Sequence, residues 1–257
     1  MRQDSLFVLD CNYLDANRIF IVSSKRGEYR ERRDVAIVCC GLPAEALNWG
    51  FLKPPYDDLE ATAAAVRSYF ADRKLPFNLT FRDGEQRPVL EKLESSGWRR
   101  KSDPTPGMTL AMPTSIPTPP TRLAIQTVRT REQLVAFRDV AFRGFGYPVA
   151  VAPLFLDERL LEMPHVRCYA GLVDGAVVAT SMLIATGSVA GIYWVATLEE
   201  QRGCGYGEAL TWTAVGGGRE FGCGTASLQA SKLGRRVYTR MGFEHVLDYV
   251  HLLPPEV

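Results

Sequence analysis

The second half of the chain contains runs with the period of two typical of strands and runs with the longer period typical of helices. Thr130 and Gln133 have the spacing of a helix capping box, and Asp174-Gly175 between two apolar runs is typical of a hairpin turn. The pattern predicts strands at 123–128, 166–173, 176–186, 189–197, 226–230 and 243–253, and helices at about 130–142, 153–162 and 232–241, with one more directly after the turn that follows residue 197. A hairpin start and a strand–helix–strand end together predict an α/β fold with a mixed, largely antiparallel central sheet flanked by helices.

A proline-rich segment separates this part from the residues before it. Four prolines fall within the eight residues 113–120, and such a segment continues neither a helix nor a central strand. We interpret it as a semi-rigid linker, which predicts two units, residues 1–117 and residues 118–257. Within the first unit, the pattern predicts a helix at about 59–72.

Composition narrows the class of protein. Among 257 residues, 30 basic side chains nearly balance 29 acidic ones, which argues against a strongly basic nucleic-acid binder. No apolar run approaches the roughly 18–20 residues of a membrane span, and the first residues become polar at Asp10 without a signal-peptide core. Six cysteines lack paired spacing and only three histidines occur, so we expect no metal site and no disulfide framework. These features together predict a cytoplasmic protein that binds neither nucleic acid nor membrane.

The stretch after the strand at 189–197 carries the clearest chemical signal. It reads Arg202-Gly203-Cys204-Gly205-Tyr206-Gly207 and continues directly into a predicted helix. Glycine at every second position allows backbone N–H groups to point into one concavity, and the helix N-terminus adds partial positive charge. The stretch therefore predicts a cradle for a phosphate or pyrophosphate, with a plain tight turn as the alternative. It is neither a Walker loop nor the dinucleotide fingerprint.

These six residues resemble the R-x-x-G-x-G acyl-CoA signature of the GCN5-related N-acetyltransferase (GNAT) superfamily. Residues 228–243 resemble the second signature of that family, with a strand, a polar residue, a helix carrying a tyrosine, and a closing Gly242-Phe243. The resemblance covers about 121–257. It implies a pair of splayed central strands with acetyl-CoA lying between them, and no metal.

The resemblance also implies roles for individual residues. Tyr238 is the implied general acid that protonates the departing CoA thiolate, and the alternative is a helix residue with its hydroxyl at the surface. Ser231 either caps the helix that begins at Lys232 or bonds to the cofactor. We interpret Cys204 as a small residue of the loop rather than an acyl-carrying nucleophile. The implied cofactor-binding residues are Val195, Ala196 and Thr197 along the pantetheine, Arg202, Gly203, Cys204, Gly205, Tyr206 and Gly207 around the pyrophosphate, and Ser231.

The general base is not evident from the sequence. Many relatives carry a glutamate on the fourth strand of the fold, but residues 189–196 contain no carboxylate. Tyr193, a main-chain carbonyl with a water chain, or a residue from elsewhere could take this role. We interpret His165 as structural, and Glu199 and Glu200 as solvated.

The acceptor is expected to be a small-molecule or peptide amine that enters between the two halves. Trp49, Phe145 and Tyr147 are candidates for lining its path, and core packing is the equally weighted alternative. Gly216-Gly217-Gly218 in the helix after the cradle indicates either close packing on the sheet or a break in the helix.

The first half contains a sequence pattern that also occurs in the second half. Gly97-Trp98 aligns with Gly242-Phe243, and on that register Leu93 falls at the place of Tyr238, while residues 51–58 have prolines and acids where glycines would be needed. We favour a degenerate second copy of the fold over an unrelated α/β cap. The predicted protein is thus a tandem N-acetyltransferase, monomeric or homodimeric, that transfers acetyl directly from acetyl-CoA to a primary amine. The alternative is a catalytically inactive CoA-binding sensor or interaction module.

Overall fold

The computed structural model describes residues 2–24, 26–83, 87–101, 103–118 and 122–256. Its helices are α1 (Arg2–Ser23), α2 (Leu59–Ala71), α3 (Arg87–Ser95), α4 (Arg131–Phe145), α5 (Ala152–Phe155), α6 (Tyr206–Glu220) and α7 (Lys232–Arg240). Its strands are β1 (Glu28–Glu31), β2 (Val35–Cys39), β3 (Asn48–Leu52), β4 (Asn78–Arg82), β5 (Arg99–Arg100), β6 (Thr105–Ala111), β7 (Ala124–Thr127), β8 (Val166–Val173), β9 (Ala176–Thr186), β10 (Val189–Thr197), β11 (Thr225–Gln229) and β12 (Glu244–Leu253). Short 3₁₀ turns, η1 to η4, span Glu45–Leu47, Val149–Val151, Glu158–Glu162 and Glu199–Gln201.

The described strands form one sheet that runs through both halves of the chain. Its order is β1-β2-β3-β4-β12-β6-β11-β10-β9-β8-β7, and β5 pairs with β12 outside this path. Within this sheet β3 is parallel to β4 and β10 to β11, and the other described pairs are antiparallel. The mixed, largely antiparallel sheet flanked by helices is therefore confirmed.

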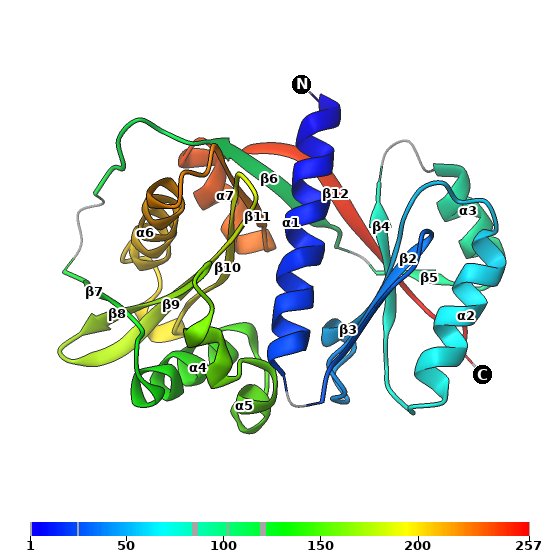
Figure 1. Cartoon of the computed structure of the whole chain (residues 1–257), viewed down its shortest axis with the longest axis horizontal. Coiled ribbons are helices and arrows are strands. Elements are labelled where there is room, and N and C mark those ends of the chain that lie inside the picture. Colours follow the sequence, from blue (N-terminus) through cyan, green and yellow to red (C-terminus); the bar gives the residue numbers. More distant parts are fainter. Residues whose placement is uncertain (1, 25, 84–86, 102, 119–121, 257) are drawn as a thin grey trace.

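The two halves exchange their last strands. β6 ends the first half in sequence but pairs with β11 of the second, and β12 ends the second half but pairs with β4 of the first. The exchanged strands also pair with each other, so that β6 and β12 cross between the two lobes in Figure 1. The division at residue 117 stays a prediction, and the sheet crosses it without interruption.

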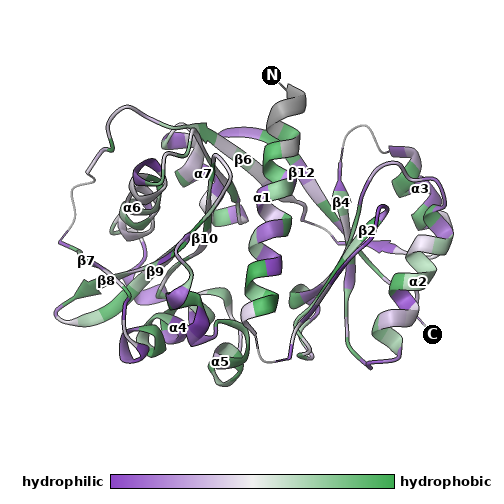
Figure 2. Cartoon of the chain, in the orientation of Figure 1, coloured by the Kyte–Doolittle hydropathy of each residue, from purple (hydrophilic) through white to green (hydrophobic). Residues whose placement is uncertain are grey.

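Helix α1 lies between the lobes and was not foreseen from the sequence (Figure 1). Leu9, Ala16, Phe20 and Ile21 are buried in a core that also contains residues of β2, β3, β9 and β12. Hydrophobic residues recur along the helix in Figure 2 because it packs on both halves. It lacks the single apolar stripe that identifies a surface helix, and this explains why periodicity does not reveal it.

The other helices divide between the two faces of the sheet. α4 and α5 share the core of α1, α6 and α7 cover a second core on the opposite face, and α2 and α3 cover a third core in the first half. The three consecutive glycines of α6 reflect close packing rather than a break. A Cβ on Gly217 would overlap the hydroxyl of Tyr169, and one on Gly218 would overlap the Cβ of Ala190.

Most predicted elements agree with the structure within a few residues, and the capping box at Thr130 and Gln133 is confirmed. The helix predicted at 153–162 is wrong, because α5 ends at Phe155 and a separate 3₁₀ turn follows. Asp157 accepts a hydrogen bond from the Arg159 amide and so begins this new turn. None of the described helices combines the length and the apolar character needed to cross a membrane.

Candidate acyl-CoA site

The central parallel strands of the second half separate part of the way along their length. β10 pairs with β11 from Val189 to Gly191, yet β10 continues to Thr197. A bulge at Trp194, whose φ is 50°, shifts the register of β10 against β9 and turns its end away from β11. The sequence resemblance implied such a splayed pair, and an extended molecule lying between the strand ends could reach their backbone groups.

Asn12 of α1 closes the base of this split. Its Oδ1 accepts hydrogen bonds from the Tyr193 hydroxyl at 2.6 Å and from the Ser227 hydroxyl at 3.0 Å. Its Nδ2 donates to Thr186 Oγ1 at 2.7 Å. Gly191 is required here, because a Cβ would overlap Asn12 Oδ1. One buried side chain thus links β9, β10 and β11 at the point where the strands part.

The glycine-rich turn leaves its backbone donors available. Gly203 and Gly205 have φ values of 80° and 78°, and no atom lies within 4 Å of where a Cβ would be on either. Within the described part of the chain, the amides from Gly203 to Gly207 donate to no backbone carbonyl. These amides meet the N-terminus of α6, so the turn has the free donors and the partial positive charge that an anion site needs.

The side chains of the predicted cofactor residues point in different directions. Arg202 and Cys204 are exposed with the two glycines of the turn, whereas Tyr206 is buried beneath α6 and offers only its backbone. A Cβ on Gly207 would lie 3.6 Å from Thr197 Oγ1 and 3.9 Å from Val195 Cγ1. Val195 and Thr197 therefore border the turn.

Ala196 faces the other way. Its Cβ lies so close to Gly144 of α4 that no Cβ would fit on that glycine. The end of β10 is thus held between α4 on one side and the first turn of α6 on the other.

Tyr238 is buried and 9% exposed, so a surface position for its side chain is wrong. Burial raises the pKa of its hydroxyl to about 12, opposed by a hydrogen bond with Thr211. Thr211 in turn donates to the carbonyl of Gly207 at 2.8 Å. The hydroxyl of Tyr238 therefore lies against the same turn of α6 that carries the free amides, and it remains a proton donor at neutral pH.

Ser231 is the N-cap of α7, where its Oγ accepts a hydrogen bond from the Gly234 amide at 3.1 Å. This is the capping role that the sequence left open. A contact between Ser231 and a cofactor stays a prediction.

Gln229, directly before this cap, was not singled out from the sequence. Its Nε2 is buried and has no hydrogen-bond partner among the described residues. Strand alternation could have found it, because Leu228 and Ala230 face the α6–α7 core and Gln229 must face the opposite side. A buried donor without a partner is costly, so this one indicates a ligand oxygen at the end of β11.

Aromatic side chains surround Trp194 at the bulge of β10. The rings of Phe142, Phe145 and Tyr147 lie with their centres 5.1, 5.3 and 6.4 Å from the Trp194 ring. Trp49 does not join them, because it is buried and stacks on Tyr13 of α1 at 5.2 Å. Core packing is therefore the better interpretation of Trp49, while half-exposed Phe145 can meet a ligand.

Tyr193 is held as a hydrogen-bond donor. Its hydroxyl donates to Asn12, and burial raises its pKa well above the ordinary tyrosine value. A buried tyrosine whose proton is already donated is poorly suited to accept one from an amine.

Helices α3 and α7 end in the same way. The Phe243 amide donates to the Tyr238 carbonyl at 2.9 Å, and the Trp98 amide donates to the Leu93 carbonyl at 3.1 Å. The glycine between them has a φ of 93° in one half and 87° in the other. Leu93 and Tyr238 thus have the same position relative to the end of their helix.

Comparisons with known proteins agree with this geometry. Residues 134–243 match the family model described as the acetyltransferase (GNAT) family. A search among curated proteins finds no match. Similar solved structures include a GCN5-related N-acetyltransferase from Kribbella flavida (18% identity, TM-score 0.72, covering 97% of this chain and 96% of that one). They also include a GCN5-related N-acetyltransferase from Sphaerobacter thermophilus (17%, 0.64, 87% and 82%) and a tandem GNAT protein from the clavulanic acid biosynthesis pathway (15%, 0.63, 93% and 87%). The chain has the GNAT fold, and the family match supports an acetyltransferase.

Proposed function

We propose that this protein is an acetyl-CoA-dependent N-acetyltransferase that transfers acetyl directly to a primary amine. The observation that carries the proposal is the junction of β10, the glycine-rich turn and α6, where free amides and the buried Tyr238 hydroxyl meet beside splayed strands. The match of residues 134–243 to the GNAT family supports the same reaction.

The residues at this junction fit acetyl-CoA. The amides from Gly203 to Gly207 would bind the pyrophosphate, and the open space beside Gly203 and Gly205 leaves room for it. The backbone of Val195 to Thr197 would bind the pantetheine amides. Gln229 Nε2 would donate to an oxygen of the bound molecule, and this hydrogen bond would offset the free-energy cost of burying the donor.

The proposed transfer is balanced without a covalent enzyme intermediate. The neutral amine nitrogen attacks the thioester carbonyl carbon, and the C–S bond then breaks to give the amide and a thiolate. The Tyr238 hydroxyl donates its proton to the thiolate. The proton that the amine nitrogen loses passes through solvent to the Tyr238 phenolate and restores its hydroxyl. A donor with a pKa of about 12 keeps its proton until the thiolate forms.

The first half is proposed to be a degenerate copy of the same fold. The matched ends of α3 and α7 support it, as does the parallel pair β3 and β4 with α2 between them. We propose that this half binds no acyl-CoA and that the acceptor reaches the site from between the halves, past Phe145 and Tyr147.

A CoA-binding module without transferase activity is the second candidate, favoured by the lack of a carboxylate on β10. Release of CoA thiol from acetyl-CoA distinguishes the two. We expect release to rise with one or more members of a panel containing spermidine, lysine, glucosamine and phenethylamine. Tight acetyl-CoA binding in calorimetry without any amine-dependent release would favour the module.

A further inference from the structure

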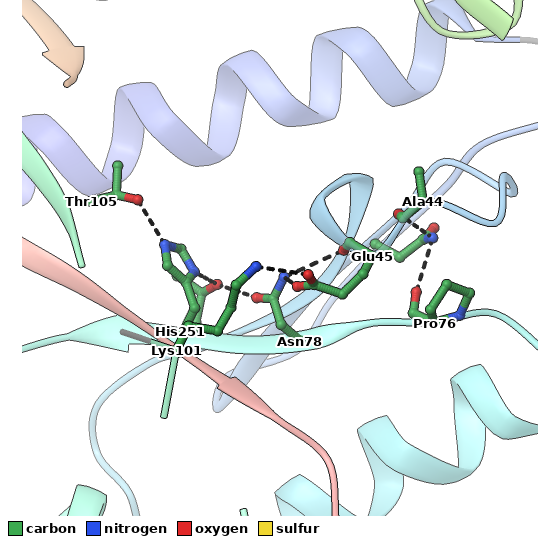
Figure 3. Close-up of polar contacts among 9 residues, drawn as sticks. Ala44, Glu45, Pro76, Asn78, Lys101, Thr105 and His251 are labelled. Atoms are coloured by element: carbon green, nitrogen blue, oxygen red, sulfur yellow. Dashed lines mark hydrogen bonds and ion pairs between the residues drawn. The ribbon is translucent and has the colours of Figure 1, made fainter. Parts of the chain in front are cut away.

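A chain of hydrogen bonds runs across the sheet from the start of β6 into the first half (Figure 3). Thr105 Oγ1 lies 2.9 Å from His251 Nε2, and His251 Nδ1 lies 2.9 Å from Thr80 Oγ1. Thr80 donates to Asn78 Oδ1 at 2.8 Å, and Asn78 Nδ2 donates to Glu45 Oε1 at 2.6 Å. The ring of His251 therefore bridges two hydroxyl groups.

The far end of the chain fixes the direction of every bond in it. Lys101 Nζ contacts Glu45 Oε2 at 2.7 Å, so the carboxylate is ionised and only accepts. Asn78 must then turn its NH₂ toward Glu45 and its oxygen toward Thr80. Because Thr80 gives its proton to that oxygen, it can only accept from His251, which places the ring proton on Nδ1.

His251 has a single ring proton under ordinary conditions. Its burial, together with the nearby Lys101 charge, lowers its pKa to about 4, and Glu45 opposes this shift. With the proton on Nδ1, Nε2 is an acceptor and receives the hydroxyl proton of Thr105. The oxygen of Thr105 is left with lone pairs and no free hydrogen.

Thr105 also lines a pocket of about 460 Å³ at the place where β11 ends. Ala230, Ser231, Lys232 and Arg235 form one wall, and Asp103, Pro104 and Pro106 form part of the other. The Ala230 amide donates to the Pro106 carbonyl at 2.8 Å, which holds the two walls together. The pocket therefore adjoins the end of β11, beside the strands proposed to hold the thioester.

We propose that Thr105 Oγ1 accepts a hydrogen bond from the acceptor amine. His251 is then the positioning residue: it accepts the hydroxyl proton of Thr105, so that this oxygen can accept a hydrogen bond from the amine but cannot donate one to it. The inference rests on the proposed function and adds the group that recognises the amine. A neutral amine that gives one N–H to Thr105 keeps its nitrogen lone pair for the thioester carbon. At this oxygen an N–H donor is favoured over a carbonyl oxygen, which would face an oxygen without a proton.

Three full-length variants test this subsite with the amine of the panel that is acetylated fastest. Thr105→Val keeps the shape and removes the hydroxyl, Thr105→Ser keeps the hydroxyl, and Thr109→Val removes a hydroxyl four residues along the same strand. We expect Thr105→Val to raise the amine KM by about 10-fold, the loss of one hydrogen bond, without changing acetyl-CoA affinity. Thr105→Ser and Thr109→Val should resemble the wild type. An unchanged amine KM in Thr105→Val, or the same rise in Thr109→Val, overturns the proposal.

The proton position on His251 is measured without any substrate. Nitrogen NMR of the full-length protein between pH 6 and 8 should show a protonated Nδ1 and an unprotonated Nε2. A proton on Nε2 overturns the proposal even if acetylation proceeds. If the wild type acetylates no amine of the panel, the proposed function fails and the amine subsite fails with it, whereas the transferase stands if only the Thr105 result is negative.

Discussion

In both halves a helix follows a central parallel strand, but only one of the two turns before these helices caps the helix N-terminus with a side chain. In the second half the N-cap is Gly205, which has no side chain, and the amides beside it stay free. In the first half the N-cap is Asp58, whose carboxylate accepts from the Ala61 amide at 3.1 Å. A helix that carries its own anion leaves little attraction for another. We therefore expect the turn rather than the helix to decide whether each half binds a phosphate.

The strands before the turns differ in the same sense. β10 extends six residues beyond its last pair with β11, from Gly191 to Thr197, whereas β3 ends one residue after its last pair with β4, at Leu52. At the equivalent helix position, Leu93 fills the core where Tyr238 offers a hydroxyl. The first half thus lacks the split and the tyrosine hydroxyl, and a carboxylate occupies the N-terminus of its helix.

The largest expected effect comes from separating the halves. Residues 119–257 alone would leave β11 without β6 and β12 without β4, so we expect no cooperative thermal unfolding by circular dichroism and no acetyl transfer. Mixing this fragment with residues 1–118 should restore both. A fragment that unfolds cooperatively and transfers acetyl by itself would show that the second half is independent.

The next largest effect is expected at Tyr238. Tyr238→Phe should lower turnover by about 10²–10⁴-fold through loss of the general acid, with little change in acetyl-CoA affinity because the ring remains. An activated thioester with a better leaving thiolate should lose less. Tyr169→Phe, another buried tyrosine of the same core, is the control and should keep its turnover. Wild-type turnover in Tyr238→Phe, with chemistry rate-limiting, assigns the role to another group.

Giving the second half the N-cap of the first should weaken acetyl-CoA binding. Gly205→Asp adds a carboxylate to the anion site at a residue with a φ of 78°, and we expect about a 100-fold higher dissociation constant in calorimetry. Gly222→Asp is the control for backbone strain. Gly222 has a similar φ of 77° but lies beyond the C-terminal end of α6, so the added carboxylate is not at the helix N-terminus. Equal losses in the two variants would mean that strain alone is responsible.

The smallest effect is expected from the caps themselves. Asp58→Ala and Ser231→Ala should each lower the free energy of unfolding by about 1 kcal/mol in urea denaturation, since each removes one capping bond. Asp58→Ala should leave acetyl-CoA affinity unchanged. A loss of affinity in Ser231→Ala beyond that expected from stability would place the Ser231 hydroxyl on the cofactor.

Local signals explain what the sequence could predict. The capping box at Thr130, the hairpin at Asp174-Gly175 and the turn from Arg202 to Gly207 depend on neighbouring residues, and the structure contains all three. Asn12 acts through partners far along the chain, and α1 is buried on several sides. Such features leave no period and no motif in the sequence.

The strand exchange was missed for the same reason. β6 and β12 have ordinary strand patterns, and nothing within either run says which neighbour it will choose. The repeat of Gly97-Trp98 and Gly242-Phe243 indicated that each half ends in a strand. It could not indicate that each strand would pair with the other half.

The exchange sets an order of events during synthesis. β4 leaves the ribosome long before β12, which must pair with it, and β6 leaves before β11. Until then the nascent first half exposes an unpaired edge, a known route to aggregation. Its correct partner is also a distant one, which slows folding. The nascent chain is therefore exposed to misassembly from the emergence of β4 until β12 has followed it.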